Sequence, residues 1–127
     1  MEKELVEKIV AVAPYMFRYE NWNNPQHSLL CFGFEVGDGW YKLLEELVLK
    51  ISEVDKERAI RVVQIKEKFG TLRFYVSWST EEIDKLIEEA EKKSSNTCDI
   101  CGGVSKVKNK NGWLHNICDI CESDDHK

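Results

Sequence analysis

The chain has 127 residues, of which 43% are hydrophobic and 32% charged, and its formal net charge is −5. This length allows one modest core with a small appendage, and the composition is typical of a soluble globular protein rather than a disordered one. No apolar run approaches the roughly 20 residues of a membrane-spanning helix, and the N-terminus does not have the pattern of a secretory signal. We therefore expect a cytoplasmic protein without membrane association.

The first predicted element is a helix over residues 2–13, which Pro14 ends. Its apolar residues recur at steps of four and three, as on one face of a helix: Leu5, Ile9 and Val12. A loop rich in aromatic residues and asparagine follows, and residues 27–34 predict a short strand. Cys31 lies in that apolar strand, so we expect a buried, inert thiol there.

A second helix is predicted over residues 40–54 after a glycine-rich turn. Its buried face is expected to hold the apolar residues at helical spacing: Trp40, Leu43, Leu44, Leu47, Ile51 and Val54. Asp38 precedes this helix, and its carboxylate is expected to accept hydrogen bonds from the first turn. A helix N-terminus can also bind an anion, but the cap and a core role for Trp40 are the favoured interpretation.

Residues 61–78 alternate between apolar and polar side chains, which predicts a β-hairpin with Gly70 in its connection. Ser79 and Glu82 match a capping box, so we expect a third helix to begin at Ser79. The fold class predicted for residues 1–94 is therefore α+β, with helices packed on a small antiparallel sheet.

Two Cys-x-x-Cys pairs near the C-terminus are the most specific motif of the chain. Sixteen residues separate the pairs, and four of the five cysteines belong to them: Cys98, Cys101, Cys118 and Cys121. Each pair lets two thiolates converge on one ion from a tight turn, which predicts a tetrahedral zinc site. Because the four thiolates fill every position, we expect one structural zinc per chain.

The zinc residues define a ribbon over residues 95–127, with a frayed acidic tail. Asn111-Gly112 predicts a hairpin turn between the knuckles. His115 could replace a thiolate ligand, although a surface position is the favoured interpretation. Lys106, Lys108 and Lys110, with Trp113 nearby, could track phosphates and stack a base, but a solvated hairpin is favoured because acidic residues surround the knuckles.

The connection of the first hairpin concentrates cations around one aromatic residue. Lys66, Lys68, Phe69 and Arg73, with Trp40, are candidate residues for binding a small anionic or nucleotide ligand. The alternative is an ordinary charged hairpin whose Phe69 packs inward.

No familiar catalytic motif is present in the sequence. Glu35, Asp38 and His27 could form a hydrolytic cluster, but only their proximity in sequence supports it. We therefore expect no enzyme activity.

Three runs of the sequence resemble a family of small uncharacterised proteins encoded by bacteriophages and bacterial mobile elements. The runs are GFEVGDGW followed by YKLLEEL, then QIKEKFGTLRFYVS, and the paired CDIC tetrapeptides, so the resemblance covers about residues 30–121. It implies a phage or mobile-element setting in a bacterial host and carries over no activity.

The leading hypothesis is a zinc-binding, non-enzymatic accessory protein that binds a host protein. The alternatives are a protein that sequesters a small anionic or nucleotide ligand, and nucleic-acid binding through the ribbon. The acidic balance disfavours nucleic acid, because proteins that bind it usually carry a basic surplus.

Overall fold

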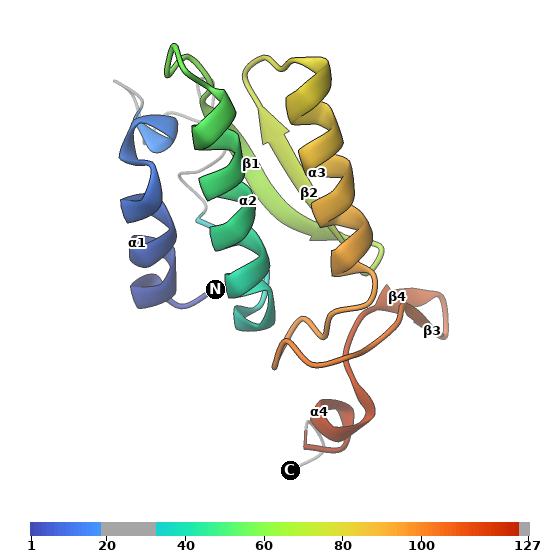
Figure 1. The fold of residues 1–127 in the computed structure, drawn as a ribbon. Coiled ribbons are helices and arrows are strands. Elements are labelled where there is room, and N and C mark those ends of the chain that lie inside the picture. Colours follow the sequence, from blue (N-terminus) through green and yellow to red (C-terminus); the bar gives the residue numbers. More distant parts are fainter. Residues whose placement is uncertain (19–32, 125–127) are drawn as a thin grey trace.

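The computed structural model describes residues 1–18 and 33–124, and it has the predicted α+β architecture. In the described part of the chain the elements are, in order, α1 (Lys3–Val12), a 3-10 helix (Pro14–Phe17), a second 3-10 helix (Asp38–Trp40), α2 (Tyr41–Val54), β1 (Val62–Lys68), β2 (Thr71–Val76), α3 (Glu81–Ser94), β3 (Lys108–Lys110), β4 (Trp113–His115) and α4 (Asp119–Asp124). Helix α2 packs between α1 and α3, and α3 packs on β2. Figure 1 shows the three helices in a row over the β1–β2 hairpin, with the C-terminal ribbon at one end.

Helix α2 supplies the centre of the core. Its buried residues follow the helical spacing that the sequence indicated: Leu44, Leu47, Val48 and Ile51. The predicted cap is wrong, because α2 begins at Tyr41 after a 3-10 turn that contains Asp38. Asp38 Oδ1 instead accepts a hydrogen bond of 2.8 Å from the backbone N–H of Glu2, just before α1. The carboxylate thus stabilises the start of the first helix.

Strands β1 and β2 form the predicted antiparallel hairpin, with Lys66 paired to Arg73. The two turn residues, Phe69 and Gly70, have φ angles of 57° and 83°. Two consecutive positive φ angles are those of a type I′ turn, whose twist matches that of the flanking strands. This turn is therefore tight, and its aromatic residue is 59% exposed instead of packing inward.

Helix α3 covers the outer edge of β2 with its own side chains. Ser94 Oγ accepts from the N–H of Leu72 at 2.8 Å, and Glu91 Oε2 accepts from the N–H of Phe74 at 3.4 Å. Edge amides that are paired in this way cannot add another strand. On the opposite side, Glu35 forms a short parallel bridge to β1. The two-stranded sheet is therefore closed at both edges over part of its length.

The start of α3 differs by one residue from the prediction. Thr80, not Ser79, is the N-cap, and its side-chain oxygen accepts from the N–H of Ile83 at 3.2 Å. In the predicted capping box, the side chain of Glu82 would also accept a hydrogen bond from the N–H of the N-cap residue. Among the described residues at the start of α3, no such bond is present.

The ribbon contains the predicted hairpin turn, since Asn111 and Gly112 have φ angles of 55° and 88° between β3 and β4. The tail from Glu122 onward was predicted as frayed, but residues 122–124 belong to helix α4 (Asp119–Asp124). The helix begins inside the second knuckle, where Glu122 N–H donates to Cys118 O at 2.9 Å.

Predictions for residues 19–32 and 125–127 lie outside the described residues. The strand predicted over residues 27–34 falls on them except for its last two positions, and the expected buried thiol of Cys31 falls on them entirely. Within residues 1–18 and 33–124, every helix is too short or too polar to span a bilayer.

Candidate metal centre

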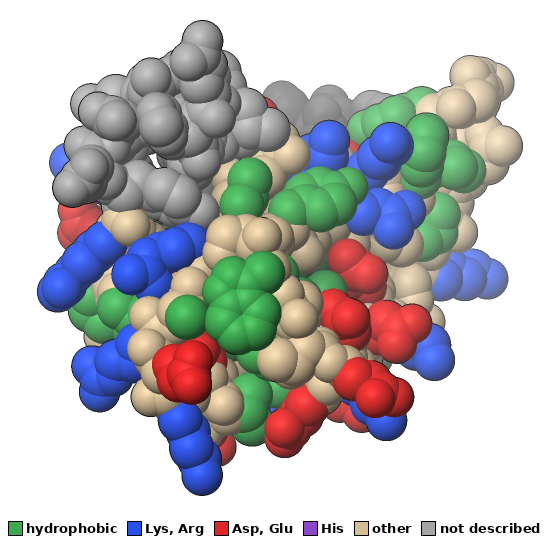
Figure 2. Space-filling view, turned by 90° about the horizontal axis from the view of Figure 1, so that it is seen from above, with side chains coloured by type: hydrophobic (Ala, Val, Ile, Leu, Met, Phe, Trp, Pro, Cys, Tyr) green, Lys and Arg blue, Asp and Glu red, His purple; other side chains and the backbone are tan. Residues whose placement is uncertain are grey.

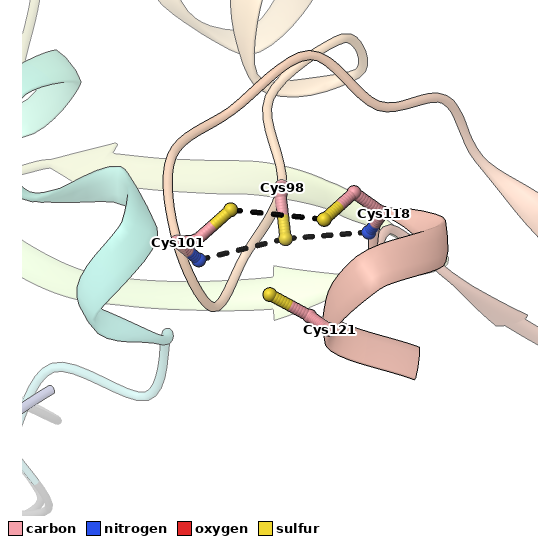
Figure 3. Close-up of side chains that lie close together, drawn as sticks. All are labelled: Cys98, Cys101, Cys118 and Cys121. Carbon is pink, nitrogen blue, oxygen red and sulfur yellow. Dashed lines mark hydrogen bonds between the residues drawn. The ribbon is translucent and has the colours of Figure 1, made fainter. Parts of the chain in front are cut away.

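Four cysteine side chains converge where the ribbon begins and where it turns into α4 (Figure 3). Their Sγ atoms all lie within 4.8 Å of one another, and those of Cys101 and Cys118 are 3.7 Å apart. Thiolates around a tetrahedral ion with metal–sulfur bonds of about 2.3 Å lie about 3.8 Å from one another. The predicted ligands therefore have the spacing and donor set of a site for one metal ion: Cys98, Cys101, Cys118 and Cys121.

Backbone amides point at the sulfur atoms of the first knuckle. The N–H groups of Cys101 and Cys118 donate to Cys98 Sγ at 3.5 and 3.3 Å, and the N–H of Gly103 donates to Cys101 Sγ at 3.3 Å. Burial raises the pKa of the Cys98 thiol, but the amide donors outweigh burial and lower this pKa to about 6. Because the thiolate is the metal-binding form, Cys98 is prepared as a ligand at neutral pH.

The remaining sulfurs show the cost of placing four thiols together. Burial, and then the neighbouring sulfur atoms, raise the pKa of Cys121. Negative charges this close repel one another, so the thiols cannot all ionise on their own. A divalent cation offsets the repulsion, which is the physical reason that such a cluster binds a metal and releases protons when it does so.

The first knuckle packs against the glycine-rich segment that precedes α2. The N–H of Gly37 donates to Asp99 Oδ1 at 2.7 Å, and that of Gly39 donates to Asp99 O at 2.9 Å. A β-carbon on Gly37 would lie 2.0 Å from Asp99 O, and one on Gly39 would lie 2.1 Å from Cys98 O. Only glycine permits such an approach of two backbones. The Gly-Asp-Gly-Trp run is therefore the surface on which the knuckle docks.

Two buried side chains hold the ribbon from either side of the knuckle. Trp40 is fully buried and donates from Nε1 to Thr97 O at 2.9 Å. Asn116, which is 2% exposed, donates from Nδ2 to Ser94 O at 2.6 Å and to Gly70 O at 3.2 Å. The ribbon is thus tied to the 3-10 helix before α2, to the end of α3 and to the turn of the first hairpin.

The aspartate of the second knuckle lies at the surface. Asp119 is 94% exposed, and its Oδ1 accepts from Lys108 Nζ at 2.5 Å. The same Nζ is 3.3 Å from Glu122 Oε2, and Lys110 Nζ is 3.9 Å from Glu122 Oε1. The hydrogen bond from Lys108 lowers the pKa of Asp119. These pairs join β3 to α4 and neutralise two lysines of the basic run.

His115 is buried, which corrects the expectation of a surface position. It is 4% exposed, its ring stacks on that of Trp113 with centroids 4.4 Å apart, and its Nε2 lies 3.4 Å from Glu122 Oε1. It is not among the side chains of the sulfur cluster. His115 therefore packs β4 against α4 behind the metal site.

Of the five candidate residues for an anionic ligand, Trp40 lies apart from the four residues of the hairpin. Lys66 and Arg73 are cross-strand partners, while Lys68 Nζ lies 5.4 Å from the centre of the Phe69 ring. Trp40 is fully buried beneath the knuckle, where it cannot line an open pocket with them. The favoured interpretation of Trp40 as a core residue is confirmed.

The carboxylates of the possible hydrolytic cluster have other partners. Glu35 Oε2 accepts from Gln64 Nε2 at 3.2 Å, Asp38 accepts from the N–H of Glu2, and His27 lies outside the described residues.

Sequence reasoning missed that the Gly-Asp-Gly-Trp run and Asn116 belong to the metal centre as its support. The sequence does contain a sign of this packing, which is the pair of glycines two residues apart next to a tryptophan. That pattern does not indicate which segment of the chain packs against the glycines. No protein-family model, no curated protein and no solved structure matches this chain.

Proposed function

We propose that the metal is zinc, bound once per chain by Cys98, Cys101, Cys118 and Cys121, with a structural role. Four thiolates in a tetrahedral arrangement favour zinc or iron, and zinc, which has no redox chemistry, is the ion that suits a purely structural role. The four sulfurs occupy every tetrahedral position, so no position is left for water or substrate. When bound, zinc closes the ribbon and holds it on the Gly-Asp-Gly-Trp segment.

We further propose that the protein is a non-enzymatic accessory protein whose ribbon binds another protein. The observation that carries this proposal is the exposure of large apolar side chains on so small a ribbon. Their exposed fractions are 43% for Ile100, 91% for Val104, 57% for Trp113 and 76% for Ile120. Apolar and aromatic residues of this kind form the centres of protein interfaces. The resemblance to phage and mobile-element proteins makes a bacterial host protein the proposed partner.

The charges of the ribbon give less support to nucleic acid as the partner. Lys108 and Lys110 both contact the carboxylate of Glu122, and Lys108 also binds Asp119. Cations that are paired in this way contribute little to binding phosphates, which depends on unpaired positive charge.

The test begins with native mass spectrometry of protein purified without chelator. We expect one zinc per chain, and a mass without metal, or with iron, would contradict the first proposal. The metal-loaded protein then serves as bait in bacterial lysate. We expect the wild-type chain to capture a host protein and the double variant Val104→Ser/Ile120→Ser to lose it. Leu49→Ser, on α2 at a site that is 46% exposed, should still capture that protein. Equal capture by the wild type, the double variant and Leu49→Ser would show that the ribbon is not the interface.

A further inference from the structure

The β1–β2 hairpin has one face in the core and one face that the helices leave open. Ile65, Leu72 and Phe74 are at most 3% exposed and belong to the hydrophobic core. Because successive side chains of a strand point to opposite faces, the cross-strand pair Lys66 and Arg73 belongs to the other face. In Figure 1 the three helices all lie on one side of the hairpin. The face that carries Lys66 and Arg73, called the open face below, is therefore free of helices.

Three cations lie on the open face without compensation. Lys66 and Arg73 stand directly opposite each other, and two like charges in that position destabilise a sheet. Lys68 is two positions along β1 from Lys66, so its side chain points to the same face. Among the described residues, none of these three side chains forms an ion pair. Arg73 Nε is buried and has no hydrogen-bond partner in that part of the chain.

The carboxylates at the two edges of the hairpin have other partners. Glu35 Oε2, beside β1, accepts from Gln64 Nε2 at 3.2 Å. Glu91 Oε2, beside β2, accepts from the N–H of Phe74 at 3.4 Å. Burial raises the pKa of Glu91, and the N–H of Phe74 and the charge of Arg73 offset this rise only in part. The positive charge of the open face therefore remains available to an anion.

Two exposed aromatic side chains stand beside these cations. Tyr75, two positions after Arg73, is 43% exposed, and Lys66 Nζ lies 5.9 Å from the centre of its ring. Phe69, in the turn, is 59% exposed, and Lys68 Nζ lies 5.4 Å from the centre of its ring. Basic and hydrophobic side chains lie side by side near the upper edge of Figure 2. Each ring thus has a positive charge next to it and a large part of its surface in solvent.

Phe69 has a backbone conformation that a bulky residue rarely adopts. The φ angles of Phe69 and Gly70 are 57° and 83°, and those of Asn111 and Gly112 in the ribbon hairpin are 55° and 88°. The two turns are of the same kind, and Asn-Gly is a sequence that this kind of turn favours. A bulky side chain at positive φ is a strained exception, and this one stays more than half exposed. Strain that the core does not require is typical of functional positions, which indicates a role for the ring in binding.

We propose that the open face of the hairpin binds single-stranded nucleic acid. Lys66, Lys68 and Arg73 contact its phosphates, and its bases stack on the rings of Phe69 and Tyr75. A free nucleotide suits this face less, because small ligands are bound in concave pockets that bury most of their surface. A duplex also suits it less, because paired and stacked bases are not available to aromatic side chains. The proposal depends neither on the identity of the metal nor on the ribbon interface.

The probe is a fluorescein-labelled oligothymidylate of about 12 nucleotides, a length within the usual range for one such surface. It is titrated with the full chain and its metal, and fluorescence anisotropy reports binding. We expect binding that weakens as salt is raised. An abasic strand of the same length keeps the phosphates, and we expect it to bind about tenfold more weakly because stacking is lost. An oligouridylate that binds at least as well supports the same proposal with RNA as the strand.

Variants of the two rings test stacking separately from charge. Phe69→Asn removes the ring and introduces the residue type that Asn111 supplies in the ribbon turn. We expect this variant to keep or raise the Tm, because the turn strain is relieved, and to bind the oligothymidylate about tenfold more weakly. Tyr75→Leu keeps an apolar side chain at its position and is expected to weaken binding by a similar factor.

Variants of the cations test the contacts with phosphates. Lys66→Gln/Arg73→Gln should weaken binding and lower its dependence on salt, because fewer phosphates are neutralised. The matched control is Lys85→Gln/Lys92→Gln, which removes the same charge from exposed positions on α3 and should bind as the wild type does. Equal losses in the two double variants would overturn the open face as the site. Failure of both strands to bind, or unchanged binding by the two ring variants, would overturn the proposal as a whole. Equal binding of the abasic strand or of a duplex would replace nucleic-acid bases by any polyanion, an acidic protein included, and would overturn it as well.

Discussion

The two knuckles share the tetrapeptide Cys-Asp-Ile-Cys, yet their first two residues make different contacts. In the first, Cys98 is fully buried and Asp99 accepts two backbone hydrogen bonds from the segment before α2. In the second, Asp119 is 94% exposed and pairs with a lysine of the neighbouring strand. The isoleucines follow the same order, with 43% exposure for Ile100 and 76% for Ile120.

This difference shows that the tetrapeptide alone determines the metal-binding turn, whereas the contribution of each knuckle to the fold depends on distant parts of the chain. Each tetrapeptide can bring two sulfurs together without help from the rest of the chain. Only the first meets a backbone with no β-carbons, at Gly37 and Gly39. The first knuckle therefore anchors the ribbon, and the second presents its side chains to solvent. Four pairs of variants test this distinction.

The largest effect is expected from loss of a ligand. Cys98→Ser and Cys118→Ser should both release the metal, because each removes one of its four ligands. The effect on folding should be large, since structural zinc sites contribute about 10–16 kcal/mol to the folding of small peptides. Cys118→Ser should unfold the ribbon and leave the helices formed, although with a lower Tm because the contacts of Asn116 with α3 are lost. Cys98→Ser should lower Tm further, since its sulfur is buried and accepts two amides. Metal analysis and circular dichroism check both, and retention of one metal by either variant would contradict the assignment.

Gly39→Ala should be next in size, because its β-carbon would overlap Cys98 O. We expect a loss of about 1–3 kcal/mol in the free energy of unfolding, together with weaker metal binding as the knuckle is displaced. Gly112→Ala is the matched control, with open space around it but a φ of +88°. It should cost about 1–2 kcal/mol through backbone strain and leave metal affinity unchanged. Competition with a chelator measures the affinity, and equal affinities would show that docking does not support the site.

The aspartates should separate the knuckles by a smaller amount. Asp99→Ala leaves the partly buried N–H of Gly37 without its partner, which costs about 1–3 kcal/mol. Asp119→Ala removes an exposed ion pair, and such pairs contribute at most about 1 kcal/mol. Urea denaturation compares the two, and the order is expected to hold at high salt, where the exposed pair weakens further. A reversed order would mean that the second knuckle contributes more to the free energy of unfolding than the first.

The smallest effects are expected at the isoleucines. Ile120→Ser should change the free energy of unfolding by no more than about 0.5 kcal/mol, as is usual for an exposed position. Ile100→Ser should cost more, because over half of this side chain is covered and full burial of an isoleucine contributes about 1.5–3 kcal/mol. Urea denaturation of both variants with metal bound decides the order. Equal losses would show that the knuckles are equally covered.

The local features of this protein follow from the sequence because each depends on a short stretch of chain. Helical spacing of apolar residues located α1 and α2, strict alternation located the first hairpin, and Asn111-Gly112 located the second. Local pattern was less reliable at helix ends, where neighbouring residues compete to be the cap. Thr80 is the N-cap instead of Ser79, and Asp38 bonds the N–H of Glu2, the N-cap of α1, instead of the first turn of α2.

The four cysteines were identified as one cluster from their spacing alone, because two such turns determine which sulfurs can converge on an ion. What the tertiary structure decided is which knuckle docks on the segment before α2, and why Gly37, Gly39, Trp40 and Asn116 are needed. These residues contact segments up to 62 positions away in the chain, and no periodicity or motif encodes a partner at that distance. Two identical tetrapeptides can differ only through what packs against them, and packing is a property of the folded chain.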